Sequence, residues 1–308
     1  MRKDLGNLGG LRVTYTIHRS LTPRSDELVV LHHGICHSAE HFDELIAALN
    51  QAGYHVAMID QQIEAGGWLA SNWVRLGSCV AGMKLALESI EQDTSYRVGG
   101  FVLHSMGALI GETVQRDDPE WARPTVLLAP IPLGGALPVS LRLFFRYPLA
   151  YLRAVLTLNI RSLASTPART RKIFFDVDTP DTLVERTCQL LKHASFRVYL
   201  QLVLRGILGP FIPNNDQRKL LITSPTDFIF RPSQYQGTLA RYTPMDHVQS
   251  DGGHDFFMQY ANETAERIAS FLAKDASTSA VPPPHVSFEQ EQRPKTTSAK
   301  SEARADSV

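Results

Sequence analysis

The sequence contains little cysteine, no excess of charge of either sign and no long hydrophobic run. Three cysteines in 308 residues are too few and too scattered for a disulfide framework or a cysteine-rich zinc site, so we expect free thiols in a cytoplasmic protein. Lysine plus arginine and aspartate plus glutamate each number 31, and this balance favours no nucleic-acid partner. No window reaches the roughly 18 apolar residues of a membrane-spanning helix, and the first ten residues do not resemble a signal peptide.

Short apolar runs and helical patterns alternate along much of the chain. Apolar runs at 28–31, 97–103, 125–129 and 220–223 read as buried strands, and helical spacing of apolar residues separates most of them. Strand–helix alternation is typical of a parallel sheet with helices on both faces. The sequence therefore predicts an α/β fold built on a mostly parallel, doubly wound sheet.

The alternation stops between two of these strands. Residues 131–218 are mainly helical in pattern and rich in leucine, phenylalanine and arginine, so we predict a helical cap inserted into the core. The core then comprises residues 11–130 and 219–274. From residue 275 to 308 the chain is rich in Ser, Thr, Pro, Gln and Lys and cannot bury a core, which predicts a disordered tail.

Ser105 lies where an apolar strand passes directly into a helical pattern. A serine on a sharp turn of this kind presents its hydroxyl beside the N–H groups of a helix N-terminus. The turn is similar to a G-x-S-x-G nucleophile elbow, with Gly107 in place but Leu103 at the first glycine position. Leu103 requires either a different crossing of strand and helix or a looser turn. The alternative function of Ser105 is to cap an ordinary helix.

An acid and a histidine follow later strands in the order that a serine nucleophile requires. Asp227 lies just beyond the strand 220–223, at the sheet edge where active sites of parallel sheets gather, although an Asx-turn or helix cap would also explain it. His254 follows two glycines at the start of the last helix, whereas its nearest rival, His247, has no such loop. We predict Ser105 as nucleophile, His254 as base and Asp227 as the acid that orients it.

Two backbone N–H groups are candidates for the oxyanion hole. Met106 follows the nucleophile, and Ile35 follows His33-Gly34 at the end of an early strand, where glycine permits a twist that aims an N–H into the site. We also predict that Gly34, His33 and His104 contact the substrate.

Four histidines crowd the loop after the first buried strand. His32, His33, His37 and His41 surround Cys36, but their spacing matches no recognised zinc pattern. We therefore predict no metal site, and expect these rings to bond to loop backbone or to line the pocket.

These motifs together resemble the α/β-hydrolase superfamily over residues 28–272. Within it, the chain is similar to the branch of capped esterases, monoacylglycerol-lipase-like and serine-aminopeptidase-like proteins. The resemblance implies an eight-stranded, mostly parallel sheet, a helical cap and no cofactor. The chain departs from it at Leu103 and after Asp60, where Gln61-Gln62-Ile63-Glu64 replaces the Arg-Gly-His-Gly turn common in that branch.

The sequence thus predicts a serine hydrolase that cleaves a carboxylic ester of a hydrophobic substrate through an acyl-enzyme. The same triad also serves acyltransferases, amidases and C–C hydrolases, and a non-catalytic ligand-binding protein of this fold is a further alternative. The stretch 141–153 mixes apolar residues with arginines. It fits a cap helix with a solvated basic face; it also fits a lipophilic pocket with arginines at its mouth, or weak contact with a membrane surface. The basic cap favours an anionic or amphipathic substrate, and the sequence gives no oligomeric state.

Overall fold

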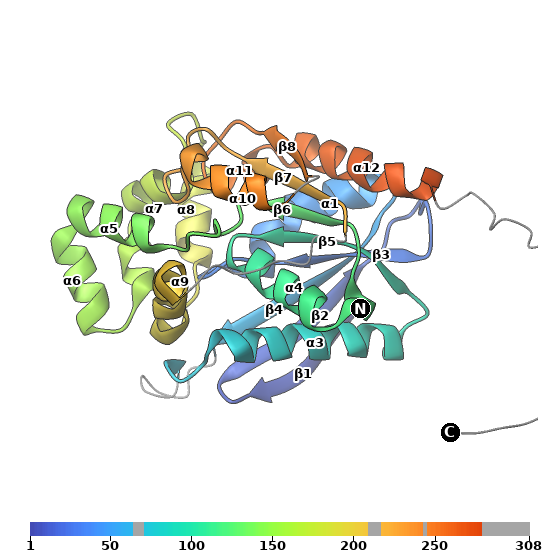
Figure 1. Cartoon of the computed structure of the whole chain (residues 1–308), viewed down its shortest axis with the longest axis horizontal. Coiled ribbons are helices and arrows are strands. Elements are labelled where there is room, and N and C mark those ends of the chain that lie inside the picture. Colours follow the sequence, from blue (N-terminus) through green and yellow to red (C-terminus); the bar gives the residue numbers. More distant parts are fainter. Residues whose placement is uncertain (64–70, 209–216, 243–244, 279–308) are drawn as a thin grey trace, which may run out of the picture.

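The computed structural model describes residues 1–63, 71–208, 217–242 and 245–278. Its strands form one eight-stranded sheet in the order β1-β2-β4-β3-β5-β6-β7-β8 (Figure 1). The strands are β1 (Arg2–Leu8), β2 (Leu11–His18), β3 (Glu27–His32), β4 (His55–Ile63), β5 (Arg97–His104), β6 (Thr125–Leu128), β7 (Lys219–Thr223) and β8 (Met245–Gln249). The pairs β1–β2 and β2–β4 are antiparallel, and the other five neighbouring pairs of this sheet are parallel. The predicted mostly parallel sheet is confirmed.

Helices cover both faces of this sheet, which explains why its central strands are apolar. On one face α1 (Asp43–Gln51) packs against α12 (Ala261–Thr278), and on the other α3 (Leu76–Asp93) packs against α4 (Met106–Asp117). Every residue of β6 and all of β3 after Glu27 are buried. A strand covered on both faces gains from apolar side chains at every position, so period-two alternation disappears.

A group of helices separates β6 from β7 and gathers at one end of the sheet (Figure 1). They are α5 (Leu137–Arg146), α6 (Pro148–Leu156), α7 (Pro167–Phe174), α8 (Asp181–Leu190) and α9 (Phe196–Leu208), with the 3-10 turn η3 (Ile160–Ala164) between α6 and α7. The remaining described elements are η1 (Ala39–Phe42), η2 (Pro119–Trp121), η4 (Pro232–Tyr235), α10 (Gln236–Arg241) and α11 (Phe256–Gln259). We refer to α5–α9 as the cap helices. Within the described residues, no helix is both long and apolar enough to cross a bilayer.

Three local predictions differ from the structure. Strand β1 lies before residue 11, where we placed the start of the core; its charged and glycine residues hide a strand that is held by pairing with β2. The sequence pattern predicts a weak last strand near residues 241–243, but the last strand is β8 at Met245–Gln249, whose mostly exposed side chains give it little apolar signal. Helix α12 continues to Thr278, four residues into the predicted tail, and residues 279–308 lie outside the described part.

Candidate active site

Ser105 occupies a strained turn between β5 and α4. Its backbone angles are φ 52° and ψ −116°, a conformation that costs energy for any residue with a Cβ atom and that clusters at functional sites. Its side chain forms no hydrogen bond that caps α4. A Cβ atom on Gly107 would lie 2.7 Å from the carbonyl oxygens of His32 and His33, so only glycine fits there. The turn is sharp, and its serine is not explained by helix capping.

The missing first glycine of the elbow is replaced by a glycine on the helix. Leu103 is fully buried, and a Cβ atom on Gly111 would lie 2.5 Å from Leu103 Cδ1. The close approach of β5 and α4 therefore depends on a small residue on the helix side instead of the strand side. This contact resolves how the turn accommodates Leu103.

Asp227 and His254 form a buried pair. His254 Nδ1 lies 2.8 Å from Asp227 Oδ2, and Asp227 Oδ1 accepts backbone N–H groups from Ile229 and Phe230 at 2.6 and 3.0 Å. Burial lowers the pKa of His254, but the charge and hydrogen bond of Asp227, together with the charge of Asp255, outweigh it and leave that pKa above its ordinary value. The acid thus holds the ring by one nitrogen and stabilises its protonated form.

The glycine before His254 is required by the cap. A Cβ atom on Gly253 would lie 2.4 Å from the Phe174 carbonyl oxygen at the end of α7. Asp255 N also donates to the Phe174 carbonyl, at 3.0 Å. The loop around His254, residues 252–255, which we call the histidine loop, therefore packs directly against the cap helices.

Ser105 and His254 line the same apolar cavity. Its volume is about 100 Å³, well above the roughly 10–15 Å³ that one water needs. The other lining residues, from the core loops and the cap helices, are Ile35, Cys36, His37, Ile131, Ala136, Val139, Leu143, Ile160, Arg161, Leu163, Ala164, Ile173, Phe174, Leu191, Tyr199, Leu202, Ile229 and Phe230. Within the described residues the Ser105 hydroxyl forms no hydrogen bond to His254, and such bonds are often long before substrate binds.

The loop after β3 lies against the serine. A Cβ atom on Gly34 would lie 2.9 Å from Ser105 Cβ. His33 Nδ1 lies 2.8 Å from the Gly34 carbonyl oxygen, which can only accept, so this nitrogen carries a proton. That carbonyl belongs to the same planar peptide as the Ile35 N–H. His33 thus fixes the direction in which Ile35 N–H points, while Met106 N–H is one of the donors that the first turn of α4 leaves unpaired.

Comparisons with known proteins identify the fold. Residues 23–173 match the family model described as serine aminopeptidase, S33. The structure superposes on the esterase EaEST from Exiguobacterium antarcticum with a TM-score of 0.65, at 14% identity, covering 89% of this chain and 100% of that one. The chain has the α/β-hydrolase fold. A hydrolase from Pseudomonas aeruginosa PA01 (TM-score 0.63, 17% identity, 88% and 98% covered) and the monoacylglycerol lipase of Paleococcus ferrophilus (0.61, 17%, 85% and 98%) share this α/β-hydrolase fold. No curated protein sequence matches the chain significantly.

His33 and His104, two of the residues predicted to contact the substrate, are not among the residues that line the cavity. His104 is completely buried and is not among the residues that line the cavity, because side chains alternate along β5 and its ring points away from it. Burial holds the pKa of His104 well below its ordinary value, so the ring is neutral. His33, also buried, bonds to the Gly34 carbonyl and the Gln61 N–H. Both residues lie behind the site rather than in the cavity. Gly34 lies beside Ser105, and its contact with the substrate stays a prediction.

Sequence reasoning missed a second buried histidine–aspartate pair. Asp255 is fully buried; its Oδ2 lies 2.8 Å from His37 Nε2 and its Oδ1 3.5 Å from His104 Nε2. His37 Nδ1 in turn lies 2.9 Å from the Ile35 carbonyl oxygen. One carboxylate thus ties together the loop after β3, the end of β5 and the histidine loop. The available signal was an acid beside the predicted base, followed by two phenylalanines.

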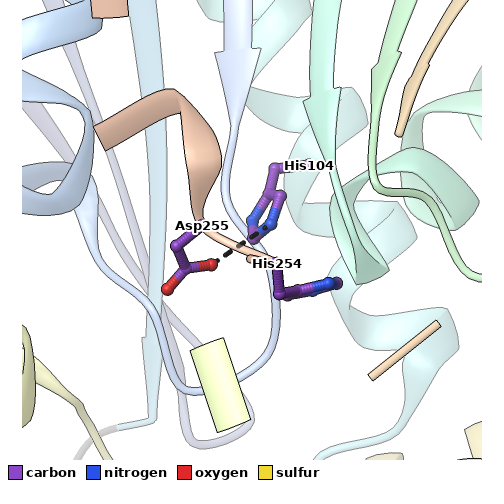
Figure 2. A group of neighbouring side chains, drawn as sticks. All are labelled: His104, His254 and Asp255. Atoms are coloured by element: carbon purple, nitrogen blue, oxygen red, sulfur yellow. Dashed lines mark ion pairs between the residues drawn. The ribbon is translucent and has the colours of Figure 1, made fainter. Parts of the chain in front are cut away.

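His104, His254 and Asp255 come close enough to raise the question of a metal. Their ligand atoms lie within 4.8 Å of one another, but the His254 ring and the Asp255 carboxylate point in different directions (Figure 2). His254 Nδ1 and Asp255 Oδ2 are each already hydrogen-bonded to another side chain. The histidines of the β3 loop all have a ring nitrogen within 3.3 Å of a loop carbonyl oxygen, as we expected.

Proposed function

We propose that this protein is a serine hydrolase that cleaves carboxylic esters with a hydrophobic acyl or alkyl group. One observation carries the proposal: a serine in a strained strand-to-helix turn and a buried histidine–aspartate pair open onto one apolar cavity. An unactivated hydroxyl is useful at neutral pH only beside a base, and a base of raised pKa accepts the proton readily. The fold of esterases and lipases is consistent with this chemistry but does not carry it.

The proposed mechanism uses the neighbouring groups in sequence. His254 accepts the proton of Ser105 Oγ as that oxygen attacks the ester carbonyl carbon, and Asp227 stabilises the imidazolium that forms. The N–H groups of Ile35 and Met106 bind the oxyanion; each such donor typically contributes about 3–4 kcal/mol to the transition state. His254 then gives its proton to the departing alcohol. Water, deprotonated by His254, hydrolyses the acyl-enzyme and releases the acid.

The apolar cavity predicts how activity depends on chain length. Burying one methylene group contributes about 0.8 kcal/mol, so kcat/KM for 4-nitrophenyl esters is expected to rise about fourfold per added methylene until the cavity is full. Steady-state kinetics on a graded acyl series measures this dependence. Uniformly negligible rates on every ester would contradict ester hydrolysis and point to an amide, C–C or acyl-transfer reaction with the same residues.

We also propose that the cap helices make weak contact with an anionic lipid surface. Half of the exposed large apolar side chains in the described chain lie on α5 and α6. Among the side chains of these two helices, Phe145 (77%) and Leu149 (82%) are the most exposed. Residues 121–175 contain no Asp or Glu but eight Lys or Arg. Exposed Arg146 and Arg153 flank the apolar side chains, a combination that suits partial insertion between acidic headgroups.

Vesicle binding tests this contact. Vesicles of phosphatidylcholine with phosphatidylglycerol should co-sediment the protein more than pure phosphatidylcholine does. The double variant Phe145→Ser/Leu149→Ser should weaken this binding about tenfold or more. Leu21→Ser/Val177→Ser, which changes two equally exposed apolar residues elsewhere, is the matched control. Equal binding of both double variants, or no preference for the acidic vesicles, would refute the contact.

A further inference from the structure

One cation lies at the wall of the apolar cavity. Arg161, in η3 between α6 and α7, lines the cavity together with Ser105 and His254, and it is the only lysine or arginine among the described lining residues. Its Nε donates to the Leu191 carbonyl oxygen at 2.6 Å. Leu191 and the neighbours Ile160 and Leu163 are themselves cavity residues. The guanidinium is therefore fixed in place against the cavity by its own backbone partner.

The rest of this guanidinium has no protein counter-charge in the described chain. Only the bond from Nε is found for Arg161, and it joins none of the ion pairs among the described residues. Other cap arginines differ: Arg142 donates to the carbonyls of Phe228 and Ile229, and Arg171 pairs with Asp181. Residues 121–175, which include Arg161, hold no acidic residue. Four N–H donors are thus left for another partner.

The two groups whose pKa values the charge of Arg161 shifts are neutral and do not balance that charge. Burial raises the pKa of the Cys36 thiol to about 12, and the charge of Arg161 opposes that rise only in part. Burial also lowers the pKa of His193, and the charge of Arg161 lowers it further. A charge beside an apolar cavity is costly unless a partner of opposite sign approaches it.

We propose that Arg161 binds an anionic group of the substrate, so that the enzyme acts on amphipathic esters that carry a carboxylate or phosphate. The inference rests on the proposed ester hydrolysis. A planar guanidinium fork matches either oxyanion with two parallel hydrogen bonds. The apolar cavity takes the hydrocarbon part, Ser105 meets the ester, and Arg161 holds the charged end. The residue is thus a determinant of specificity, separate from the three residues that carry out the chemistry.

Binding measurements test the subsite without depending on catalysis. Titration calorimetry compares nonanoate, octyl phosphate and octan-1-ol, which share one octyl chain and differ in the end group. The wild type should bind at least one of the anions roughly 10- to 100-fold more tightly than the alcohol, as one charge-assisted bidentate contact provides. In Arg161→Gln this preference should disappear, while octan-1-ol binding stays the same. The anion that loses affinity identifies carboxylate or phosphate as the recognised group.

Kinetics on a matched pair of esters links the subsite to turnover. A 4-nitrophenyl ester with a terminal carboxylate and its methyl-terminated analogue are compared in the wild type, Arg161→Gln and the control Arg19→Gln, whose exposed arginine lies outside the cavity and the cap helices. Arg161→Gln should raise KM for the charged ester alone, by roughly 10- to 100-fold. An equal loss on both esters, or unchanged anion binding in the calorimeter, overturns the proposal. If neither ester is hydrolysed by the wild type, the ester reaction fails while the calorimetry still decides the subsite.

Discussion

Ser105→Ala is expected to lower kcat for ester hydrolysis by at least about 10⁴-fold with no loss of the fold. The hydroxyl is the proposed nucleophile, and nothing in the described structure uses it as a helix cap. The β-carbon stays, so the strained backbone at φ 52° is no worse for alanine than for serine. Steady-state kinetics with a short-chain ester gives the loss, and thermal unfolding followed by circular dichroism reports on the fold.

The control for this experiment is Ser78→Ala. Ser78 lies near the start of α3 and outside the cavity, so its loss should leave kcat unchanged. Near-normal activity of Ser105→Ala would show that Ser105 is not the nucleophile. A variant that unfolds would instead support the interpretation of Ser105 as a structural residue of the turn.

Asp227→Asn is expected to lower kcat/KM by about 10⁴-fold and to move the acidic limb of its pH profile to lower pH. Asparagine keeps the size of the side chain but removes the charge that opposes the effect of burial on His254. Since His254 must be neutral to accept a proton, wild-type activity falls as the pH drops through its raised pKa. Without the Asp227 charge that pKa falls, and the remaining activity persists to lower pH.

A series of kcat/KM measurements across the acidic and neutral range distinguishes this effect from simple structural damage. Asp251→Asn changes an exposed aspartate on the loop that carries His254. This control should leave both the rate and the acidic limb of the pH profile unchanged. A damaged fold would lower the rate at every pH without moving the limb. An acidic limb that stays where it is in Asp227→Asn would contradict the proposed role of the pair.

The fold could be predicted, and Ser105, Asp227 and His254 could be chosen as candidate site residues, because local signals and sheet geometry agree. Ser105 and Asp227 each follow an apolar strand, and parallel strands bring their carboxyl ends to one edge. The structure places Asp227 and His254 in contact and puts His254 in one cavity with Ser105. The polar strand β1 could not be predicted, because its stability comes from pairing with β2 and not from its own residues.

What escaped prediction depends on contacts between distant parts of the chain or on side-chain direction. Leu103 looked unfavourable because its compensating partner, Gly111, lies on the helix eight residues later. His104 was predicted to contact the substrate, yet it is buried outside the cavity, because successive side chains of a strand point to opposite faces. Asp255 and His37 are 218 residues apart, and nothing in the sequence links them.

The most direct test of the central claim is covalent labelling with a fluorophosphonate, which reacts with an activated serine. Intact-protein and peptide mass spectrometry should find one adduct on the folded wild type, located at Ser105, slower labelling of Asp227→Asn, and none on Ser105→Ala. Folded wild-type protein that takes up no label, or a Ser105→Ala variant that labels as fast as the wild type, would contradict the assignment of Ser105 as the activated nucleophile.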